Sequence, residues 1–396
     1  FTCPVSTGDR MVSELLARTD AAAVDAAYAR VDGNTIAKFL FTSGSVGAPK
    51  AVINTQHMIC SNQQAKAQIW PFLEAQPPVI VDWLPWSHTF GGNHNLHLVL
   101  AHGGTLYIDE GRPVPGLIDK TVRNLREVQP TMLFNVPRGF DMLLPFLEAD
   151  DRLAADVLAR MRLAFYAAAL APSTWQRLQA VARRVRPAQP LWLTTSWGST
   201  ETAPAVTTAH WLLEGAGCIG APLPGLELKL VPNGSKLEMR VRGVSVFAGY
   251  RNAPRETAAA FDHEGFCRIG DAGYLVDAEQ PDKGVVFNGR VAEDFKLSSG
   301  SWVSVGTLRV DLVSQLAPLV HDIVLTGADR DEVGMLVFPS AAGAADAARL
   351  EQALQAVMRA RRDAGAGSSQ CLTRAMVMED FYKNSEQRLV EQKQKI

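Results

Sequence analysis

Short apolar runs alternate with helical patterns over the first half of the chain, and this order predicts sheets covered by helices. The predicted strands are brief, continuous apolar runs: 37–41, 131–136, 163–166 and 191–195. The predicted helices carry their apolar residues on one face: 58–70, 118–128, 153–161 and 173–185. Ser173 is the expected N-cap of the last helix. Strands joined in this way pair largely in parallel, so the chain is predicted to have an α/β fold.

The pattern changes to strict alternation of apolar and charged residues at 226–230 and 237–241. Such a period of two is typical of strands with one buried face. Asn233 and Gly234 lie between the two runs, and both tolerate the positive φ angles of a tight hairpin turn. We therefore expect an antiparallel hairpin within a small β subdomain at about 220–289.

A polar, Gly- and Ser-containing segment at 290–301 separates this subdomain from the remaining chain. Beyond it, strand-like runs at 322–325 and 335–338 and an Ala-rich helical pattern at 345–362 predict a small α+β unit. The expected organisation is a large domain of helix-covered mixed sheets, including the β subdomain, over 1–289, and a small C-terminal domain over 290–396 with a hinge at about 290–296.

Composition excludes several classes of protein. Lys and Arg number 39 and Asp and Glu number 41, so the net charge of −2 argues against a nucleic-acid-binding protein. The longest apolar run, 163–171, is far shorter than the ~18 residues of a membrane span. Five scattered cysteines form no CxxC pair, and no signal peptide is visible behind Phe1. We therefore expect a cytoplasmic protein without a membrane or nucleic-acid partner.

The loop TSGSVGAPK at 42–50 carries the strongest chemical signal. Its hydroxyls and backbone N–H groups suit phosphate oxygens, its glycines allow close approach, and its lysine supplies a cation. The expected phosphate-binding residues are Thr42, Ser43, Gly44, Ser45, Gly47 and Lys50. A Walker A loop has Gly before its lysine and Ser or Thr after it, whereas Pro49 and Ala51 occupy these positions here. A P-loop kinase or GTPase is therefore disfavoured. A plain Ser/Gly turn is the alternative for this loop.

Two further segments carry oxygen ligands. Glu201 lies in WGSTET at 197–202, directly after a predicted strand, where a carboxylate suits Mg²⁺ held against phosphates. Asp271 lies in RIGDAGYL and suits two ribose hydroxyls, although a Gly-Asp pair is also common in simple turns. His94 and His97 form a His-x-x-His pair, but no HExxH pattern surrounds them, so a metal site there is disfavoured.

Together and in this order, the three segments resemble the adenylate-forming superfamily of acyl-CoA synthetases, luciferases and peptide-synthetase adenylation domains. Further matches lie at 84–91 (LPWSHTFG), 220–225 (GAPLPG) and 289–296 (GRVAEDFK). Within this superfamily the chain is most similar to feruloyl-CoA synthetases. That closer resemblance rests on DWLPWSHTFGGNHN at 82–95, FNVP at 134–137, VAEDFKL at 291–297 and SWVS at 301–304.

The resemblance implies a two-step ligase that uses ATP, Mg²⁺ and coenzyme A to convert ferulate or a related aromatic acid to its CoA thioester. The implied catalytic residues are Lys50, Thr200, Glu201 and His88, with Glu201 as the Mg²⁺ ligand and Thr200 on the α-phosphate. The implied nucleotide-binding set adds Gly198, Ser199, Asp271 and Arg290 to the loop residues. The implied substrate residues are His88 at the acyl entrance and the residues lining the aryl or adenine pockets, Tyr166, Ala168, Ala169 and Trp197. Asp294 is the implied pivot of a mobile C-terminal domain, with Lys296 in the same hinge. The alternative for His88 is a structural histidine whose hydrogen bonds are satisfied within the fold. The alternative for Tyr166 is ordinary core packing.

The chain departs from the family at both ends. Family members carry a longer segment before the phosphate loop than the 41 residues found here, so we expect an incomplete large domain, exposed sheet edges and poor solubility. A catalytic lysine near the C-terminus is not recognisable, and Lys383, Lys393 and Lys395 are candidates by proximity only. The hypotheses are thus a hydroxycinnamate ligase, a fatty acyl-CoA synthetase, and a catalytically impaired nucleotide-binding remnant. The oligomeric state is not predicted.

Overall fold

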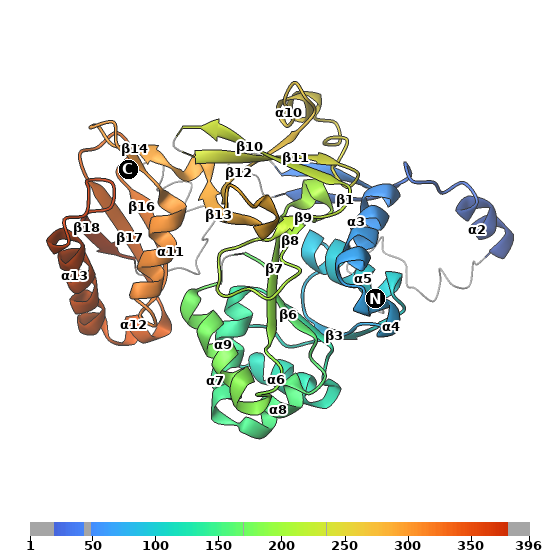
Figure 1. The fold of residues 1–396 in the computed structure, drawn as a ribbon, viewed down its shortest axis with the longest axis horizontal. Helices are drawn as coiled ribbons and strands as arrows, with labels where there is room; N and C mark the ends of the chain where they lie inside the picture. The colour runs from blue at the N-terminus through green and yellow to red at the C-terminus, as the bar shows by residue number, and fades with distance from the viewer. Residues whose placement is uncertain (1–19, 43–48, 169, 235, 379–396) are drawn as a thin grey trace, which may run out of the picture.

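The computed structural model of the protein describes residues 20–42, 49–168, 170–234 and 236–378. Helices pack on several separate sheets, so the predicted α/β class is confirmed (Figure 1). Within these ranges, none of the helices combines the length and the apolar character needed to cross a bilayer.

The largest sheet has the strand order β5-β6-β7-β8-β9. Its first three strands are parallel and the last two are antiparallel to their neighbours, which gives the mixed sheet that was predicted. The strand bounds are β5 Met132–Asn135, β6 Leu163–Tyr166, β7 Trp192–Gly198, β8 Ala205–Thr208 and β9 Ala221–Pro222. The short 3-10 helix η2, Thr200–Thr202, follows β7 directly.

Both faces of strands β5 and β6 are buried, which explains their continuous apolar runs. Leu133, Ala164 and Tyr166 pack with the helices below the sheet in Figure 1. Phe134 and Phe165 face the opposite side, among the aromatic side chains of a second cluster. The helices of the first layer are α6 Ile118–Val128, α7 Pro137–Ala149, α8 Asp151–Leu158 and α9 Pro172–Val185.

The second layer surrounds a parallel pair of strands, β3 and β4. Its rings include Trp70, Phe90, Phe134 and Phe165, with the buried His94 imidazole among them. The elements are β3 Val79–Asp82, β4 Thr105–Ile108, α3 Gln56–Ile69, α4 Phe72–Ala75, the π-helix η1 Phe90–Leu96 and α5 His97–Ala101. The antiparallel pair β1 Ile36–Thr42 and β2 Lys50–Thr55 lies beside α3, after the exposed helix α2 Ala21–Tyr28.

An antiparallel sheet of order β10-β11-β12-β13 forms above these layers in Figure 1. The predicted hairpin is confirmed, because Asn233 pairs with Lys236 at the turn and the register continues to Leu226 and Gly243. The bounds are β10 Leu226–Asn233, β11 Lys236–Gly243, α10 Pro254–Ala259, β12 Cys267–Leu275, η3 Pro281–Lys283 and β13 Val285–Arg290.

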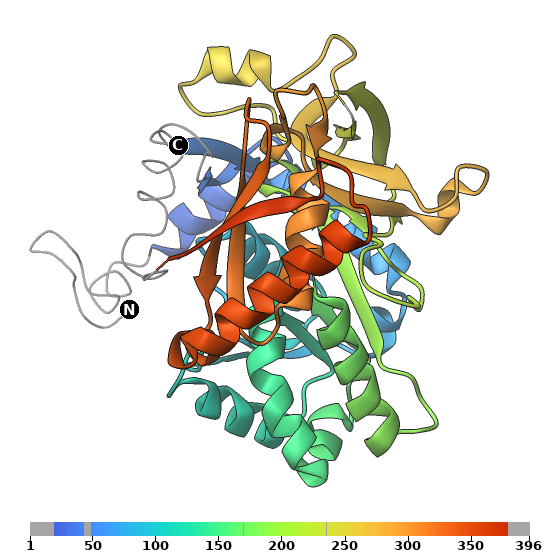
Figure 2. The ribbon, with the colours of Figure 1, turned by 90° about the vertical axis from the view of Figure 1, so that its left-hand side faces the viewer.

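The remaining elements, from Phe295 to Val377, form what we call the C-terminal lobe. Helices α11 and α13 pack on a three-stranded sheet with its own apolar core (Figure 2). The 3-10 helix η4, Val291–Glu293, leads into it from β13. The lobe contains β14 Phe295–Lys296, β15 Trp302–Val303, α11 Val305–Gln315, β16 Val320–Thr326, β17 Val333–Pro339, α12 Ala341–Ala345, α13 Ala347–Asp363 and β18 Leu372–Val377.

Two local predictions were wrong. Ser173 is not an N-cap, because helix α9 already begins at Pro172, whose fixed φ suits the first helical turn. Lys50 does not belong to the loop but opens β2, opposite Thr42. The helix predicted at about 345–362 is confirmed as α13, which begins at Ala347 after Asp346 accepts a hydrogen bond from the Arg349 N–H.

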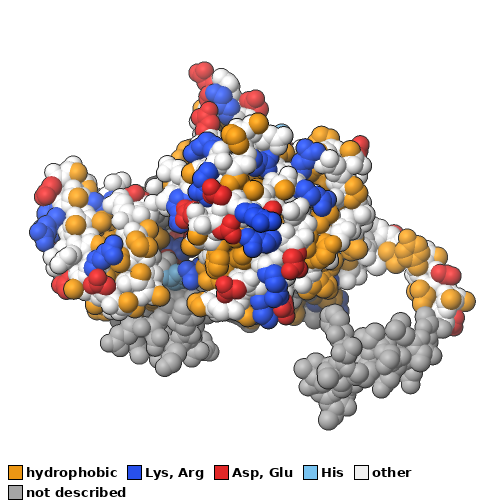
Figure 3. Space-filling model, turned by 90° about the horizontal axis from the view of Figure 1, so that it is seen from below, with side chains coloured by type: hydrophobic (Ala, Val, Ile, Leu, Met, Phe, Trp, Pro, Cys, Tyr) orange, Lys and Arg blue, Asp and Glu red, His pale blue; other side chains and the backbone are white. Residues whose placement is uncertain are grey.

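Acidic and basic side chains are interspersed on the face that helices α6–α9 present in Figure 3. They pair there across neighbouring helices, for example Arg126 with Asp150 and Arg177 with Glu148, both at 2.7 Å. Exposed pairs of this kind contribute about 0–1 kcal/mol each. The electrostatic potential over this face is therefore not dominated by charges of one sign.

The buried carboxyl group at the end of β3 predicts a pH-dependent stability. Asp82 accepts hydrogen bonds from the Leu84 N–H at 3.0 Å and from Asn95 Nδ2 at 2.8 Å, but burial dominates and raises its pKa to about 6 from the ordinary 3.8. Between these two values the folded state binds more protons than the unfolded state, so the free energy of unfolding falls as the pH rises. The two pKa values correspond to a contribution of about 3 kcal/mol.

We expect urea unfolding of the wild type to show this loss between about pH 4 and about pH 6, relative to Asp82→Asn, which does not titrate. A difference in unfolding free energy between the two proteins that stays constant over this range would contradict the assignment.

Candidate nucleotide-binding site

Lys50 and Glu201, two residues predicted for the phosphate site, both contact the Tyr250 side chain. The Tyr250 hydroxyl donates a hydrogen bond to Glu201 Oε1 at 2.9 Å. Lys50 Nζ lies 4.9 Å from the centre of the Tyr250 ring, as a cation over an aromatic face. Burial and the Glu201 charge raise the pKa of the Tyr250 hydroxyl, so it stays protonated and remains a donor. A cation and a carboxylate are thus fixed near each other on one rigid ring.

The backbone holds this group from two sides. Tyr250 bridges to Val52 of β2, and the Phe247 N–H donates to the Glu201 carbonyl at 2.8 Å. Thr42 lies opposite Lys50 at the end of β1. The structure therefore brings helix η2 to the end of β1 and the start of β2, although η2 is far from both in the sequence.

Gly198 shapes the turn that presents Glu201. A Cβ atom at this position would lie 1.8 Å from the Pro204 carbonyl oxygen, so only glycine fits the register shift between β7 and β8. Thr202 Oγ1 accepts from the Ser199 N–H at 2.9 Å and closes the turn. Ser199 Oγ is buried without a hydrogen-bond partner among the described residues, and Thr200 is half-buried beside it. An unpartnered buried hydroxyl at this point suits a ligand oxygen.

We expect Gly198→Ala to destabilise the protein by about 3 kcal/mol, because the added methyl group meets backbone rather than a flexible side chain. Thermal unfolding followed by circular dichroism measures the change. Gly215→Ala is the matched control, since Gly215, like Gly198, has no positive φ angle, and a Cβ atom there meets nothing within 4 Å. Equal losses of stability in the two variants would exclude the steric explanation.

The predicted ribose-binding residues also lie together. Trp197 Nε1 donates to Asp271 Oδ2 at 2.8 Å, and Arg290 Nε lies 3.3 Å from Asp271 Oδ1. The second contact is an ion pair without hydrogen-bond geometry, so Oδ1 has no hydrogen-bond donor among the described residues. Burial raises the pKa of the Asp271 carboxyl group, against the opposing effects of Trp197 and Arg290. A buried carboxylate with one oxygen lacking a donor suits a ligand that supplies hydroxyl groups.

Trp197 connects the two groups, since it lies in β7 four residues before Glu201. The carboxyl end of β7 therefore carries both the phosphate-side and the ribose-side residues. Open α/β sheets bind ligands at such ends.

The residues predicted for the acyl pocket are more dispersed. His88 Nδ1 accepts the Phe90 N–H at 3.1 Å, and burial lowers the pKa of its imidazole, so the ring is neutral and presents Nε2–H. Tyr166 is 1% exposed within an apolar cluster, and its hydroxyl has no hydrogen-bond partner among the described residues. Ala168 is exposed and has a φ of 63°, in the left-handed region.

The hinge residues are held in different ways. The Asp294 carboxylate is paired with Lys236 at 2.7 Å, and both side chains are 3% exposed. Lys296 is exposed, and its Nζ lies 5.0 Å from the centre of the Trp302 ring.

Several predicted residues lie outside the described ranges. They are Ser43, Gly44, Ser45, Gly47 and Ala169, together with the candidate lysines Lys383, Lys393 and Lys395. Tyr250 and Lys236 were missed, and no local motif marks either of them. Both acquire their contacts only through folding, since their partners lie 49 and 58 residues away along the chain.

The Glu201 carboxylate fits a phosphate-bound Mg²⁺ ion. Such ions are held by one or two carboxylates, and phosphate oxygens and waters complete the coordination shell. A dedicated metal centre of at least three His, Cys, Asp or Glu side chains does not occur among the described residues.

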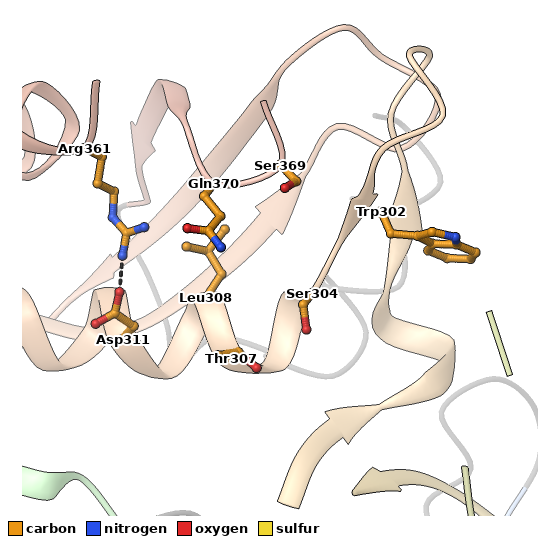
Figure 4. A pocket seen from close by; sticks show the side chains of 8 residues that line it. All are labelled: Trp302, Ser304, Thr307, Leu308, Asp311, Arg361, Ser369 and Gln370. Atoms are coloured by element: carbon orange, nitrogen blue, oxygen red, sulfur yellow. Dashed lines mark hydrogen bonds and ion pairs between the residues drawn. The ribbon is translucent and has the colours of Figure 1, made fainter. Parts of the chain in front are cut away.

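A separate cavity of about 480 Å³ lies in the C-terminal lobe (Figure 4). It is lined by Trp302, Ser304, Thr307, Leu308, Asp311, Arg361, Ser369 and Gln370. The Arg361 guanidinium is bound by Asp311 at one end of this cavity. None of the residues predicted for the site contributes to its lining.

Comparison with known proteins gives a consistent result. The profile of the family described as "AMP-binding enzyme" matches residues 2–251. The chain is 25% identical to the "Long-chain-fatty-acid--CoA ligase heimdall" of Drosophila melanogaster over 78% of this chain and 50% of that protein. It is 29% identical to a carboxylic acid reductase of Mycobacterium marinum over 88% of this chain and 31% of that protein.

Among solved structures, the fold matches the AMP complex of the O-succinylbenzoate coenzyme A synthetase MenE from Bacillus subtilis. The TM-score is 0.68 at 19% identity, over 90% of this chain and 68% of that chain. The chain spans only 26% to 55% of the length of the curated relatives that it matches first.

Proposed function

From the premise that the chain belongs to the AMP-binding enzyme family, we propose that it is an ATP-dependent acid–CoA ligase acting on ferulate or related hydroxycinnamates. In the first step, a carboxylate oxygen attacks the α-phosphorus of ATP, and the bond from that phosphorus to pyrophosphate breaks. In the second step, the CoA thiolate attacks the acyl carbonyl of the adenylate, and AMP leaves with the bridging oxygen.

The observation that carries this proposal is the meeting of Lys50, Tyr250 and Glu201 beside the Trp197–Asp271 pair. Phosphoryl chemistry asks the protein mainly to position groups and to neutralise charge. Lys50 neutralises phosphate charge, Thr200 donates to the α-phosphate, and Tyr250 orients the Glu201 carboxylate. Bound Mg²⁺ supplies further neutralisation when Glu201 holds it.

The ribose is assigned to Asp271 and Arg290. The Asp271 carboxylate accepts the ribose hydroxyl hydrogens, and the Trp197 indole N–H fixes its orientation. His88 stands at the acyl entrance with its Nε2–H available as a donor. The pocket for the aromatic ring is assigned to Tyr166, Ala168, Ala169 and Trp197.

Ferulate is proposed on the motif at 82–95, in which His88 lies. A fatty acid is the second candidate, because two of the similar relatives are described as long-chain-fatty-acid–CoA ligases, from Drosophila melanogaster and Yersinia pestis. A nucleotide-binding remnant that binds ATP without turnover is the third candidate, and the same measurement tests it.

The deciding experiment measures pyrophosphate release from Mg-ATP with ferulate, p-coumarate, benzoate and palmitate in separate reactions, with Lys50→Ala as the loss-of-function control. Release with ferulate or p-coumarate that Lys50→Ala abolishes supports the proposal. Preference for palmitate would establish the second candidate. Binding of ATP without release in any reaction would establish the remnant.

We also propose that the C-terminal lobe turns about Asp294 between the two steps, with the large domain over 1–289 and the small domain over 290–396. Rotation of this kind would let one site serve two different attacking groups. The proposed hinge lies between the Arg290 end of β13 and strand β14.

A further inference from the structure

The C-terminal lobe is attached to the β10–β11 hairpin by a buried ion pair. Lys236 is the first residue of β11, and its Nζ lies 2.7 Å from Asp294 Oδ1. The same Nζ donates to the Arg290 carbonyl at 3.2 Å. Both side chains of the ion pair are 3% exposed, so solvent screens it little. Lys236 thereby ties the hairpin to the chain on both sides of helix η4.

Asp294 also binds the start of helix α11. Its Oδ1 also accepts the Val305 N–H at 2.9 Å, at the first residue of that helix. The N-cap residue Ser304 makes no side-chain cap bond, so the Asp294 carboxylate provides this cap in its place. Removing Lys236 would leave a buried carboxylate whose second oxygen, Oδ2, already lacks a partner among the described residues.

Close backbone packing accompanies the ion pair. A Cβ atom on Gly306 of α11 would lie 2.7 Å from Gly289 Cα of β13, so the two segments approach as only glycines allow. One residue further along, Thr307 Oγ1 donates to Asn288 Oδ1 at 2.9 Å. The Trp302 ring packs on the hairpin turn, 3.1 Å from a Cβ atom built on Gly234. In Figure 4, Trp302 is turned away from Arg361 and Asp311 at the far side of the cavity.

We propose that Lys236 is a positioning residue that latches the C-terminal lobe onto the hairpin, so that the lobe turns about Asp294 only when the Lys236–Asp294 pair opens. This inference rests on the proposed function, because it takes the hinge from there. The latch adds a residue outside the hinge that sets how long the lobe stays in the arrangement seen here. It therefore also sets the ratio between the rates of adenylate formation and thioester formation.

Hydrogen exchange followed by mass spectrometry tests the latch without any need for activity. Lys236→Met is expected to speed amide exchange at 294–306 at least about tenfold, because an unpaired buried carboxylate favours opening. Gly306→Ala perturbs the same contact without a change of charge and is expected to act in the same direction. Circular dichroism establishes that each variant is folded.

Arg240→Met is the matched control. Arg240 lies on the same strand and is mostly buried in pairs with Glu238 at 2.7 Å and Asp262 at 3.1 Å, neither of which belongs to the C-terminal lobe. Its exchange at 294–306 is expected to equal that of the wild type. Unchanged exchange in Lys236→Met, or an equal rise in Arg240→Met, would overturn the latch.

The positioning role is tested by measuring adenylate formation and thioester formation separately in Lys236→Met. The latch predicts that the ratio of the two rates changes by at least about tenfold, since only the lobe arrangement is altered. Equal fractional losses in both steps would overturn the positioning role. If the wild type releases no pyrophosphate, the proposed function fails, whereas the exchange measurement still decides the latch.

Discussion

Glu201→Gln is expected to lower the rate of Mg²⁺-dependent pyrophosphate release about a thousandfold, which corresponds to about 4 kcal/mol of transition-state stabilisation. The substitution keeps the size of the side chain and an oxygen that accepts from the Tyr250 hydroxyl. It removes the negative charge on which Mg²⁺ binding depends. The fold is therefore expected to remain while the metal-dependent step fails.

Initial rates measured across a Mg²⁺ titration provide the test. Glu256→Gln is a suitable control, because Glu256 is an exposed carboxylate in the first turn of α10. Tyr250→Phe removes only the hydrogen bond to Glu201, so its expected loss is much smaller, about tenfold. A Glu201→Gln enzyme with wild-type Mg²⁺ dependence would remove Glu201 from the metal site.

The elements that the sequence predicted well are those whose signals are local. The β10–β11 hairpin follows from a period of two and a two-residue turn, and both signals lie within a few residues of the contacts they predict. The runs at 131–136 and 163–166 are apolar at every position because β5 and β6 are buried on both faces. Local pattern and burial agree in these elements.

The residues that the sequence analysis overlooked or assigned wrongly have a different explanation. Tyr250 and Lys236 look like ordinary side chains in the sequence, since nothing near them shows that one will contact Glu201 and the other will be buried against Asp294. Ser173 has a residue type that favours an N-cap, but Pro172 starts the helix one residue earlier. Contacts between distant segments, and competition between neighbouring signals, were beyond what local patterns specify.

The site itself was predicted in part. Lys50 and Glu201 meet around Tyr250, and Trp197, Asp271 and Arg290 meet at the end of β7, as the motif order implied. Their roles toward ATP remain predictions. The resemblance assigned Trp197 to the aryl or adenine pockets, and its indole N–H is bonded to Asp271, the residue predicted for the ribose.

Asp271→Asn is expected to raise the KM for ATP about a hundredfold with little change in kcat, because the ribose contacts are the same in the ground state and the transition state. Asp271 accepts from Trp197 and faces Arg290, and the amide would lose one acceptor oxygen and the attraction of the guanidinium. Loss of two charge-assisted hydrogen bonds is consistent with an effect of about 3 kcal/mol.

The pH dependence makes this prediction more specific. Burial raises the pKa of Asp271, so its carboxylate gains a proton at a higher pH than an exposed aspartate does. A protonated carboxyl group accepts ribose hydroxyls poorly, so the KM for ATP of the wild type is expected to rise as the pH falls toward that pKa. The KM of Asp271→Asn is expected to stay level over the same range, because the amide does not titrate. Asp277 is a partly exposed carboxylate two residues beyond β12, and Asp277→Asn is expected to follow the wild type. If Asp271→Asn showed the same pH dependence as the wild type, another group would hold the ribose.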